Sequence, residues 1–466
     1  MSRPFWTRTV SQRYLDLTRE KLQLARLPRE PYGLSRIEEL GVKKAELEPL
    51  LDYWLETYDC RAQEQLYNDK LPQYRISIPP PRHTQVSSEV QQDNLRLHFV
   101  HRRSTFPNAI PLLICHDWGG SFLEAARVIE ALCEPVSTPP LGQLDVPAFH
   151  FICPSIPGFG FSDTSPDPEF GLEKTAEVFH QLMLKLGYDR YMIYGSGWGF
   201  NIARAISLRH KSSILGIHAV NVETPFPSFR QYPFIWLKYH IARLTNARIQ
   251  LLSFAYMPTD FASAAPHNSR PTIAQDNTMV PAASNAIAHP QTLSYALADS
   301  PTGLLAFLLD LIKPNDLHSG TVQPEDQPPS ATFPPSTDSR SPTMPLERIR
   351  SDVWTSTDII TWTMLYWLPG PEAALRWLKN ALRETRASDF WHSYSRVPLG
   401  ITYFQPSTGA AISPPVWMSA YHNLTWLRRH DRQARWPCWE AGDEVVMDLR
   451  DFAREIRGHV TRDREG

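Results

Sequence analysis

The chain has 466 residues, of which 42% are hydrophobic and 21% charged, and its formal net charge is -2. These values are typical of a folded, water-soluble protein with two or three structural units. They give no reason to expect nucleic acid or an acidic membrane surface as a partner. The first 30 residues lack a signal-peptide core, and no stretch reaches the roughly 20 apolar residues of a membrane span. We therefore expect a cytoplasmic protein without a membrane anchor.

The cysteines point to the same compartment. They are widely spaced and form no Cys-x-x-Cys pair, which argues against a disulfide framework or a zinc site and favours a reducing environment. The five residues are Cys60, Cys115, Cys133, Cys153 and Cys438. We expect no metal and no cofactor, since the sequence also contains no nucleotide-binding loop.

Residues 1–100 are predicted to form a helical meander that leads into strands. Amphipathic helical patterns cover residues 9–25 and 43–55. From residue 71 the pattern becomes that of strands, over 71–76 and then over 95–101, where apolar and polar residues alternate.

Residues 101–224 alternate between strands and helices, which predicts an α/β fold with a doubly wound, mostly parallel sheet. The predicted strands are 110–115, 148–154, 189–194 and 214–222, and the predicted helices are 122–133 and 200–208. This region is the first part of the core.

Residues 225–395 are predicted to form a helical, aromatic-rich lid inserted before the last part of the core, residues 396–466. Within the lid, residues 324–345 hold seven prolines with serine, threonine and aspartate, a composition typical of a disordered loop. Helical patterns return at 352–366 and 372–383. The core then ends with strands at 397–404 and 423–428 and a helix at 444–456.

The segment Gly195-Ser196-Gly197-Trp198-Gly199 has the pattern of a nucleophile elbow, a strained turn between a strand and a helix. Such a turn needs small residues two positions before and after its apex. Gly195 and Gly199 meet this need only if the apex is Gly197, which has no side chain to attack a substrate. Ser196 lies one residue away, so it is either a displaced nucleophile or a serine with a local turn hydrogen bond.

These segments, in order, resemble the microsomal-type epoxide hydrolase family of α/β-hydrolases across nearly the whole chain. The resembling stretches are Leu71–Tyr74, Leu97–His101, His116–Phe122, Pro157–Ser162, the elbow, and Leu293–Ala306. The resemblance implies an α/β-hydrolase fold with an N-terminal meander and a helical lid. It also implies an aspartate nucleophile at the elbow, two lid tyrosines that donate to the epoxide oxygen, and a histidine–carboxylate pair that activates water.

All five positions that the resemblance assigns to this chemistry carry other residues. They are Gly197 for the nucleophile, Arg435 for the base, Ser407 for its carboxylate partner, and Ala282 and Leu378 for the lid tyrosines. An arginine stays protonated and cannot act as a base. The hydrolytic mechanism of the family is therefore not expected here.

The oxyanion loop departs as well. His116 and Trp118, together with Trp198 of the elbow, match the family, but Asp117 stands where a glycine is usual and Gly119 where a proline is usual. A carboxylate beside two oxyanion-hole amides would repel a developing oxyanion. Asp117 is either an acid or base facing the site, or a solvated or helix-capping carboxylate ahead of residue 122. His116 is interpreted as a structural histidine.

Two residues near the end of the last predicted strand have open roles. His430 is either an exposed surface histidine or a residue that turns toward the site. Arg435 is expected to point into the former active site as a buried cation, which needs a partner. Candidates are Asp117, a more distant carboxylate or an anionic ligand.

Three hypotheses for function remain. The first is an epoxide hydrolase that uses other residues. The second is a cyclase, isomerase or dehydratase for a polyketide-like or terpenoid intermediate, in the secondary metabolism that the resemblance implies; this chemistry needs shape and an acid or base but no nucleophile. The third is a non-catalytic binder or scaffold. In each case the expected partner is an apolar small molecule, not nucleic acid, and the oligomeric state is open.

Overall fold

The structure is a computed structural model that describes residues 9–30, 41–79, 81, 94–135, 146–262, 288–312, 353–386, 388–405 and 413–465. Its centre is an eight-stranded sheet in the order β1-β2-β4-β3-β5-β6-β7-β8. β1 pairs with β2, and β2 with β4, in antiparallel register, whereas every pair from β4 to β8 is parallel. The predicted doubly wound, mostly parallel α/β sheet is confirmed.

The strands are β1 Gln73–Ile78, β2 Leu95–Arg102, β3 Ile110–Cys115, β4 Phe149–Pro154, β5 Tyr191–Ser196, β6 Ile214–Val220, β7 Ser395–Gln405 and β8 His422–Gln433. The core and N-terminal helices are α1 Gln12–Gln23, α2 Lys44–Glu56, α3 Cys60–Lys70, α4 Ile129–Cys133, α5 Leu172–Lys185, α6 Trp198–Arg209, α16 Pro437–Glu440 and α17 Gly442–Glu465. The remaining helices are α7 Pro233–Leu244, α8 Gln250–Ser253, α9 Thr259–Ala262, α11 Pro290–Asp299, α12 Pro301–Ile312, α13 Ser356–Trp367, α14 Glu372–Arg386 and α15 Ser388–His392. Short 3₁₀ helices are η2 Phe122–Arg127, η3 Lys211–Ser213 and η6 Pro415–Ala420.

Most predicted elements are present, with differences at their ends. The strand predicted at 423–428 is β8, which is twice as long, and the helix predicted over 122–133 is divided into η2 and α4. Helix α5 was not predicted. The proline-rich stretch 324–345, Ala282 and Ser407 lie outside the described residues.

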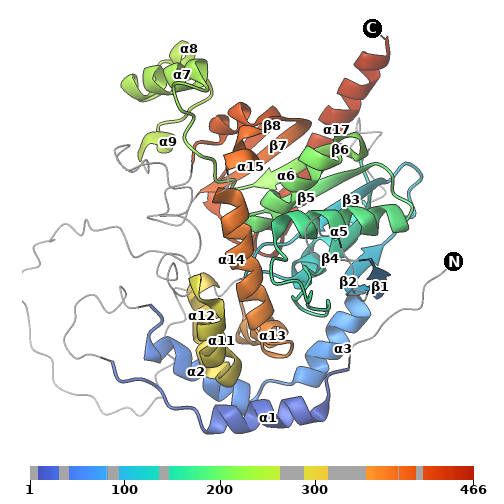
Figure 1. The fold of residues 1–466 in the computed structure, drawn as a ribbon. Helices are drawn as coiled ribbons and strands as arrows, with labels where there is room; N and C mark the ends of the chain where they lie inside the picture. Colours follow the sequence, from blue (N-terminus) through green and yellow to red (C-terminus); the bar gives the residue numbers. More distant parts are fainter. Residues whose placement is uncertain are drawn as a thin grey trace, which may run out of the picture.

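Helices pack on both faces of the sheet, which explains why the central strands β3, β4, β5 and β6 are mostly apolar and buried. α5 and α6 lie on one face and α17 on the other (Figure 1). Gly216 in β6 and Gly400 in β7 let α17 approach closely, since a Cβ at either position would lie 2.3 Å from Ile456 or 2.6 Å from Phe452.

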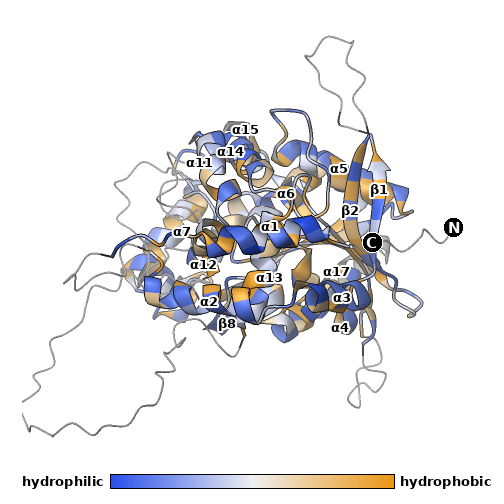
Figure 2. Ribbon diagram, turned by 90° about the horizontal axis from the view of Figure 1, so that it is seen from below, coloured by the Kyte–Doolittle hydropathy of each residue, from blue (hydrophilic) through white to orange (hydrophobic). Residues whose placement is uncertain are grey.

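The N-terminal helices wrap around the lid helices (Figure 1). The Tyr53 hydroxyl lies 2.7 Å from the Thr357 hydroxyl of α13, and the Trp367 indole donates to Thr18 over 2.8 Å. Hydrophilic and hydrophobic residues alternate around α1 and α2 (Figure 2), as expected for helices with one face on the core. The predicted amphipathic meander is therefore a layer that covers the lid.

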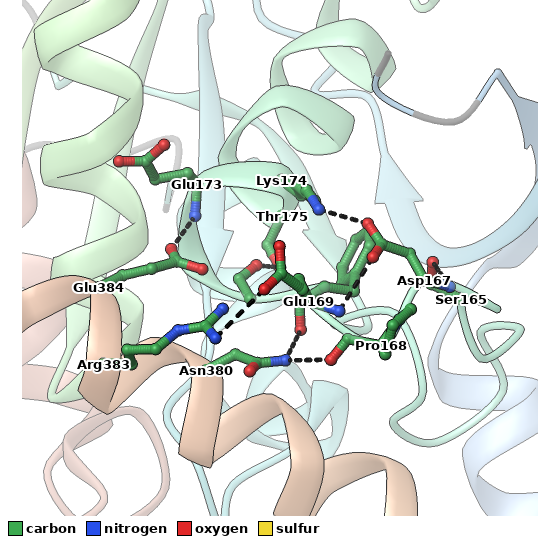
Figure 3. Close-up of polar contacts among 12 residues, drawn as sticks. Ser165, Asp167, Pro168, Glu169, Glu173, Lys174, Thr175, Asn380, Arg383 and Glu384 are labelled. Carbon is green, nitrogen blue, oxygen red and sulfur yellow. Dashed lines mark hydrogen bonds and ion pairs between the residues drawn. The ribbon is translucent and has the colours of Figure 1, made fainter. Parts of the chain in front are cut away.

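Helix α14 is fixed to the beginning of α5 by a set of polar contacts (Figure 3). The Asn380 amide donates to the carbonyls of Pro168 and Phe170 at 2.9 and 3.1 Å. The Glu384 carboxylate accepts from the Glu173 backbone N–H at 2.8 Å, so it satisfies one of the free amides at the α5 N-terminus. The lid is therefore attached to the core by hydrogen bonds as well as by the burial of apolar side chains.

Within the described ranges, no single helix is long and apolar enough to cross a membrane. α11 and α12 reach the required length and apolar character only when they are taken together, and the chain bends by 115° at their junction. Much of α12 is buried in the core, including Leu305 and Leu309.

Candidate active site

The apex of the elbow between β5 and α6 is Gly197, as the sequence predicts. Its backbone angles are φ 50° and ψ -120°, a conformation that side-chain-bearing residues rarely adopt. The flanking glycines are required by space: a Cβ at Gly195 would lie 2.6 Å from the Gly199 backbone, and a Cβ at Gly199 would lie 2.0 Å from the Cys115 carbonyl oxygen. Ser196 is the last, buried residue of β5 and not the apex.

The carboxylate of Asp117 occupies the place that the elbow leaves empty. Its Oδ1 accepts from the backbone N–H of Trp118 at 2.7 Å and of Trp198 at 2.8 Å. A Cβ built on Gly197 would lie 2.1 Å from Asp117 Oδ2 and 2.4 Å from its Cγ. The two amides that would form an oxyanion hole are thus already filled by a carboxylate, reached from the loop after β3.

The solvated interpretation of Asp117 is wrong. The residue is completely buried, and its carboxylate caps the first residue of α6 rather than the helix at residue 122. The N-terminus of α6 carries a partial positive charge that favours an anion there. Burial of this carboxylate is offset by these donors and by a cation.

That cation is Arg435, which lies in the turn between β8 and α16. Its Nη1 donates to Asp117 Oδ2 at 3.1 Å, so Asp117 is the partner among the candidates. Its guanidinium also stacks on the Trp436 ring, 4.3 Å from the centroid. The side chain is 26% exposed, so Arg435 is partly accessible and not the buried cation that the sequence suggested. Among the described residues, its buried Nη2 has no hydrogen-bond partner.

The turn that carries Arg435 is held from two sides. Glu440 Oε2 accepts from the backbone N–H of Arg435 at 2.5 Å and of Trp436 at 3.0 Å. Asn221, after β6, donates to the Ala434 carbonyl at 3.1 Å and accepts from the Phe404 N–H at 2.8 Å. The backbone next to Arg435 is therefore tied to the ends of β6 and β7.

The charge of Asp117 acts on two other carboxyl groups, those of Glu124 and Glu223. Burial raises the pKa of Asp117, an effect opposed by Arg435 and by the amides of Trp198 and Trp118. Burial, with the Asp117 charge, raises the pKa of Glu124 to about 8. Desolvation by surrounding protein also raises the pKa of Glu223 to about 8, with Arg435 lowering it and Asp117 raising it. The Glu223 side chain also reaches solvent, so water moderates this last shift.

His116 has the structural role that the sequence analysis assigned to it. Its Nε2 accepts from the Ile156 N–H at 3.2 Å, and its Nδ1 lies 2.9 Å from the Asp117 carbonyl oxygen, to which it donates. Burial lowers the pKa of His116 to about 4, so the ring is neutral. It joins the loop after β3 to the end of β4.

The lid fixes the same loop from above. The indole of Trp362 donates to the Gly119 carbonyl at 2.6 Å, and the Tyr366 hydroxyl donates to the Gly120 carbonyl at 2.8 Å. The indole of Trp118 donates to the Ala374 carbonyl in α14 at 3.0 Å. Asp117 is thus carried by a loop that both the sheet and the lid hold in position.

Two other residues singled out in the sequence are Leu378 and His430. Leu378, at a position that the resemblance assigns to a lid tyrosine, is buried in the core on α14. His430 is not an exposed histidine: its Nε2 lies 2.8 Å from Oδ2 of the buried Asp448 in α17, and its ring stacks on Phe404. Asp448 also accepts from Thr402 at 2.6 Å, which makes this a separate polar cluster.

Sequence reasoning missed Glu223, Asn221 and Glu440. The position of Glu223, just after a predicted strand of a parallel sheet, was an available signal, because carboxyl ends of such strands meet at one edge. The roles of Asn221 and Glu440 depend on contacts with β7, β8 and α16 that no local pattern indicates.

Comparisons with known proteins agree with this geometry. The family model described as epoxide hydrolase N terminus matches residues 3–125, and the one described as alpha/beta hydrolase fold matches residues 110–303. With the sheet order and the elbow between β5 and α6, they define the chain as an α/β-hydrolase.

Individual relatives narrow the class. The chain is 26% identical over 421 residues to "Putative epoxide hydrolase" of Stigmatella aurantiaca, covering 90% of this chain and 77% of that protein. It is 29% identical to "Epoxide hydrolase 1" of Sus scrofa, covering 66% of this chain and 61% of that protein. The crystal structure of juvenile hormone epoxide hydrolase from Bombyx mori has the same fold, with a TM-score of 0.69 at 20% identity over 97% of this chain and 94% of that one. These matches relate the chain to epoxide hydrolases within the α/β-hydrolase fold.

Proposed function

We propose that this protein rearranges an apolar biosynthetic intermediate by acid–base chemistry and does not hydrolyse epoxides through an ester at residue 197. The observation that carries the proposal is the placement of the Asp117 carboxylate on both elbow amides, in the volume that a side chain at residue 197 would need. With these amides filled, an oxyanion of substrate finds no donors there. The cation that accompanies this carboxylate stands where the family's base would be.

The groups at the site suit proton transfer. Burial raises the pKa of both carboxyl groups, but Asp117 accepts from two amides and pairs with Arg435, and these contacts favour its charged form. We therefore give Asp117 the role of base and Glu223 the role of acid, a division that neighbouring carboxyl groups in different environments can adopt. We assign proton removal from substrate to Asp117 Oδ2 and proton delivery to Glu223. Stabilisation of the resulting anion is assigned to Nη2 of Arg435, which has no hydrogen-bond partner among the described residues.

This assignment supports cyclisation, isomerisation or dehydration. In an isomerisation, a C–H proton passes to Asp117, the electron pair moves onto a substrate oxygen beside Arg435, and Glu223 protonates another atom, so the product has the mass of the substrate. Substrate would approach from the side of Arg435 and Glu223, the accessible members of the set. A polyketide-like or terpenoid intermediate of secondary metabolism, handled in the cytoplasm, has the apolar character that we expect.

A second candidate function is epoxide opening by Asp117 itself. Its carboxylate is oriented by two amides beside the position of the family's nucleophile, so Oδ2 could attack an epoxide once Arg435 moves aside. Without a histidine at residue 435, the resulting ester would be hydrolysed slowly. A third outcome, a non-catalytic binder or scaffold, predicts ligand binding without any change of the ligand.

The test is incubation of the purified chain with a panel of aryl and alkyl epoxides and of terpenoid and polyketide-like epoxides and ketones. Products and the intact protein are analysed by mass spectrometry in water labelled with ¹⁸O. We expect products isomeric with the substrate or smaller by one water, formed without label. Asp117→Asn and Glu223→Gln should each reduce the rate by about 100-fold or more, while the control Asp163→Asn, whose carboxylate pairs with Arg75 of β1 and Arg96 of β2, leaves it unchanged.

Other results would overturn the proposal in distinct ways. Labelled diol, or a protein adduct that maps to Asp117, would establish epoxide opening by the displaced carboxylate. Saturable binding of the panel compounds without conversion would establish a binder. Unchanged rates in both site variants would show that Asp117 and Glu223 are not the acid and base.

A further inference from the structure

The segment that contains α7 and α8 presents large apolar side chains to solvent. Leu244 is 87% exposed, Leu251 86% and Phe234 78%. Leu237 and Ile249 are also exposed, and we call these five residues the α7–α8 apolar face. In Figure 1 these two helices stand apart from the sheet and from the other lid helices. Contiguous exposed apolar residues of this kind usually mark an interaction surface.

The apolar face is not a part of the core that has come loose. α7 already packs its opposite side: Tyr239 and Ala242 are fully buried in a small cluster with Tyr256 and Trp417. Since successive helical residues turn by about 100°, Leu237 and Leu244 lie two turns apart on one face, pointing away from Tyr239. α7 therefore has two apolar faces, and within the described part of the chain only the face with Tyr239 and Ala242 is covered.

The charged residues within this stretch of sequence, between Glu223 and Asp260, are all basic. Residues 224–259 contain Arg230, Lys238, Arg243 and Arg248 and no aspartate or glutamate. On α7, Lys238 lies about 100° to one side of Leu237, and Arg243 about 100° to the other side of Leu244. Both cationic side chains are exposed. The net charge of -2 for the whole chain conceals this local excess.

We propose that the α7–α8 apolar face binds an anionic membrane surface. Apolar residues flanked by lysine and arginine are the pattern of helices that lie in the plane of a lipid interface. The leucines and Phe234 enter the region between headgroups and acyl chains, and the cations contact anionic headgroups. Such binding is peripheral and does not depend on a spanning helix or on the chemistry proposed for Asp117.

The test is flotation of the full chain with vesicles of phosphatidylcholine alone and with about 30% phosphatidylserine. We expect flotation with the anionic vesicles, and loss of it in high salt, which screens the charges. Leu244→Glu/Leu251→Glu should weaken binding at least about tenfold. The matched control is Leu24→Glu/Leu184→Glu, which changes two exposed leucines outside this segment. All four sites are exposed, so circular dichroism and the melting temperature should match those of the parent chain.

Three results would overturn the proposal. One is absence of the protein from floated anionic vesicles. Another is equal flotation of the Leu244/Leu251 variant and the parent chain. The third is a dimer, seen by light scattering at the protein concentrations used, that the same variant converts to monomer, which would show that a second copy covers this face.

Discussion

At the scale of single residues, Asp117 and Gly197 share one volume. The carboxylate of Asp117 lies where the Cβ of a side chain at residue 197 would be. An aspartate therefore fits at one of these two positions only if the other position has a small residue. Their identities are therefore coupled through space, although they come from the loops after β3 and β5. An aspartate at residue 197 would therefore require a smaller residue at 117 as well.

This coupling is measurable as stability. We expect Gly197→Ala to lower the free energy of unfolding by about 3–5 kcal/mol, because it combines strained backbone with displacement of a buried carboxylate. Asp117→Gly in the same chain should recover about 1 kcal/mol or more in a double-mutant cycle measured by urea denaturation. The control is Gly187→Ala, whose φ is +85° but whose added Cβ meets no atom within 4 Å; we expect a loss of about 1 kcal/mol. Strict additivity of Gly197→Ala and Asp117→Gly would contradict the shared volume.

At the scale of elements, the attachment of α14 to α5 depends on a carboxyl group that titrates near neutrality. Burial, together with the Glu173 charge, raises the pKa of Glu384 to about 7, although the hydrogen bond from the Glu173 backbone amide lowers this pKa. A carboxyl group with a higher pKa in the folded protein binds protons more tightly there. Its contribution to stability is therefore largest below the unfolded pKa of 4.5 and decreases as pH rises to about 7.

Removing this titration should flatten the pH dependence of stability. We expect the parent chain to lose about 1–2 kcal/mol relative to Glu384→Gln as the pH rises from about 5 to about 8. Thermal unfolding of both proteins across that range measures the difference. Glu169→Gln is the control, since Glu169 pairs with Arg383 at the same contact but is exposed. A pH-independent difference between parent and Glu384→Gln would refute the assignment.

At the scale of the whole molecule, the N-terminal helices are an integral layer and not an appendage. Trp54 of α2 is buried in the same continuous core as the sheet and the lid helix α13. The core thus extends from the meander through the lid to α17. Loss of packing in the N-terminal layer should therefore destabilise the lid helix that carries Trp362 and Tyr366. Because these two side chains donate to the loop of Asp117, that loop should be destabilised as well.

We expect Trp54→Ala to lower the free energy of unfolding by about 3–5 kcal/mol and to keep a single cooperative transition. Leu66→Ala, at a half-exposed position on α3, should cost less than about 1 kcal/mol. Urea denaturation followed by fluorescence and by far-ultraviolet circular dichroism measures both. Two separate transitions, with an early one confined to the N-terminal helices, would show that this layer folds independently.

The sequence alone was sufficient for the features that depend on local pattern. The apex at Gly197 followed from the spacing of Gly195 and Gly199, since a Cβ at either flank meets backbone of the same turn or of β3. The central strands followed from apolar runs, because the part of a parallel sheet that is buried on both faces needs them. The absence of an aspartate at the apex and of a histidine at residue 435 was visible in the same way.

Only the tertiary structure decided which side chains surround the elbow. One interpretation of Asp117 from the sequence was a solvated carboxylate. Its exposure could not be predicted, because it depends on the parts of the chain that pack over this loop, which are Arg435, α6 and the lid. The pairing of Asp117 with Arg435, the nearness of Glu223 and the two-faced surface of α7 all join residues from different strands and helices. Local sequence sets the conformation of a turn or helix, but the neighbours that desolvate, charge or cover a side chain come from elsewhere in the chain.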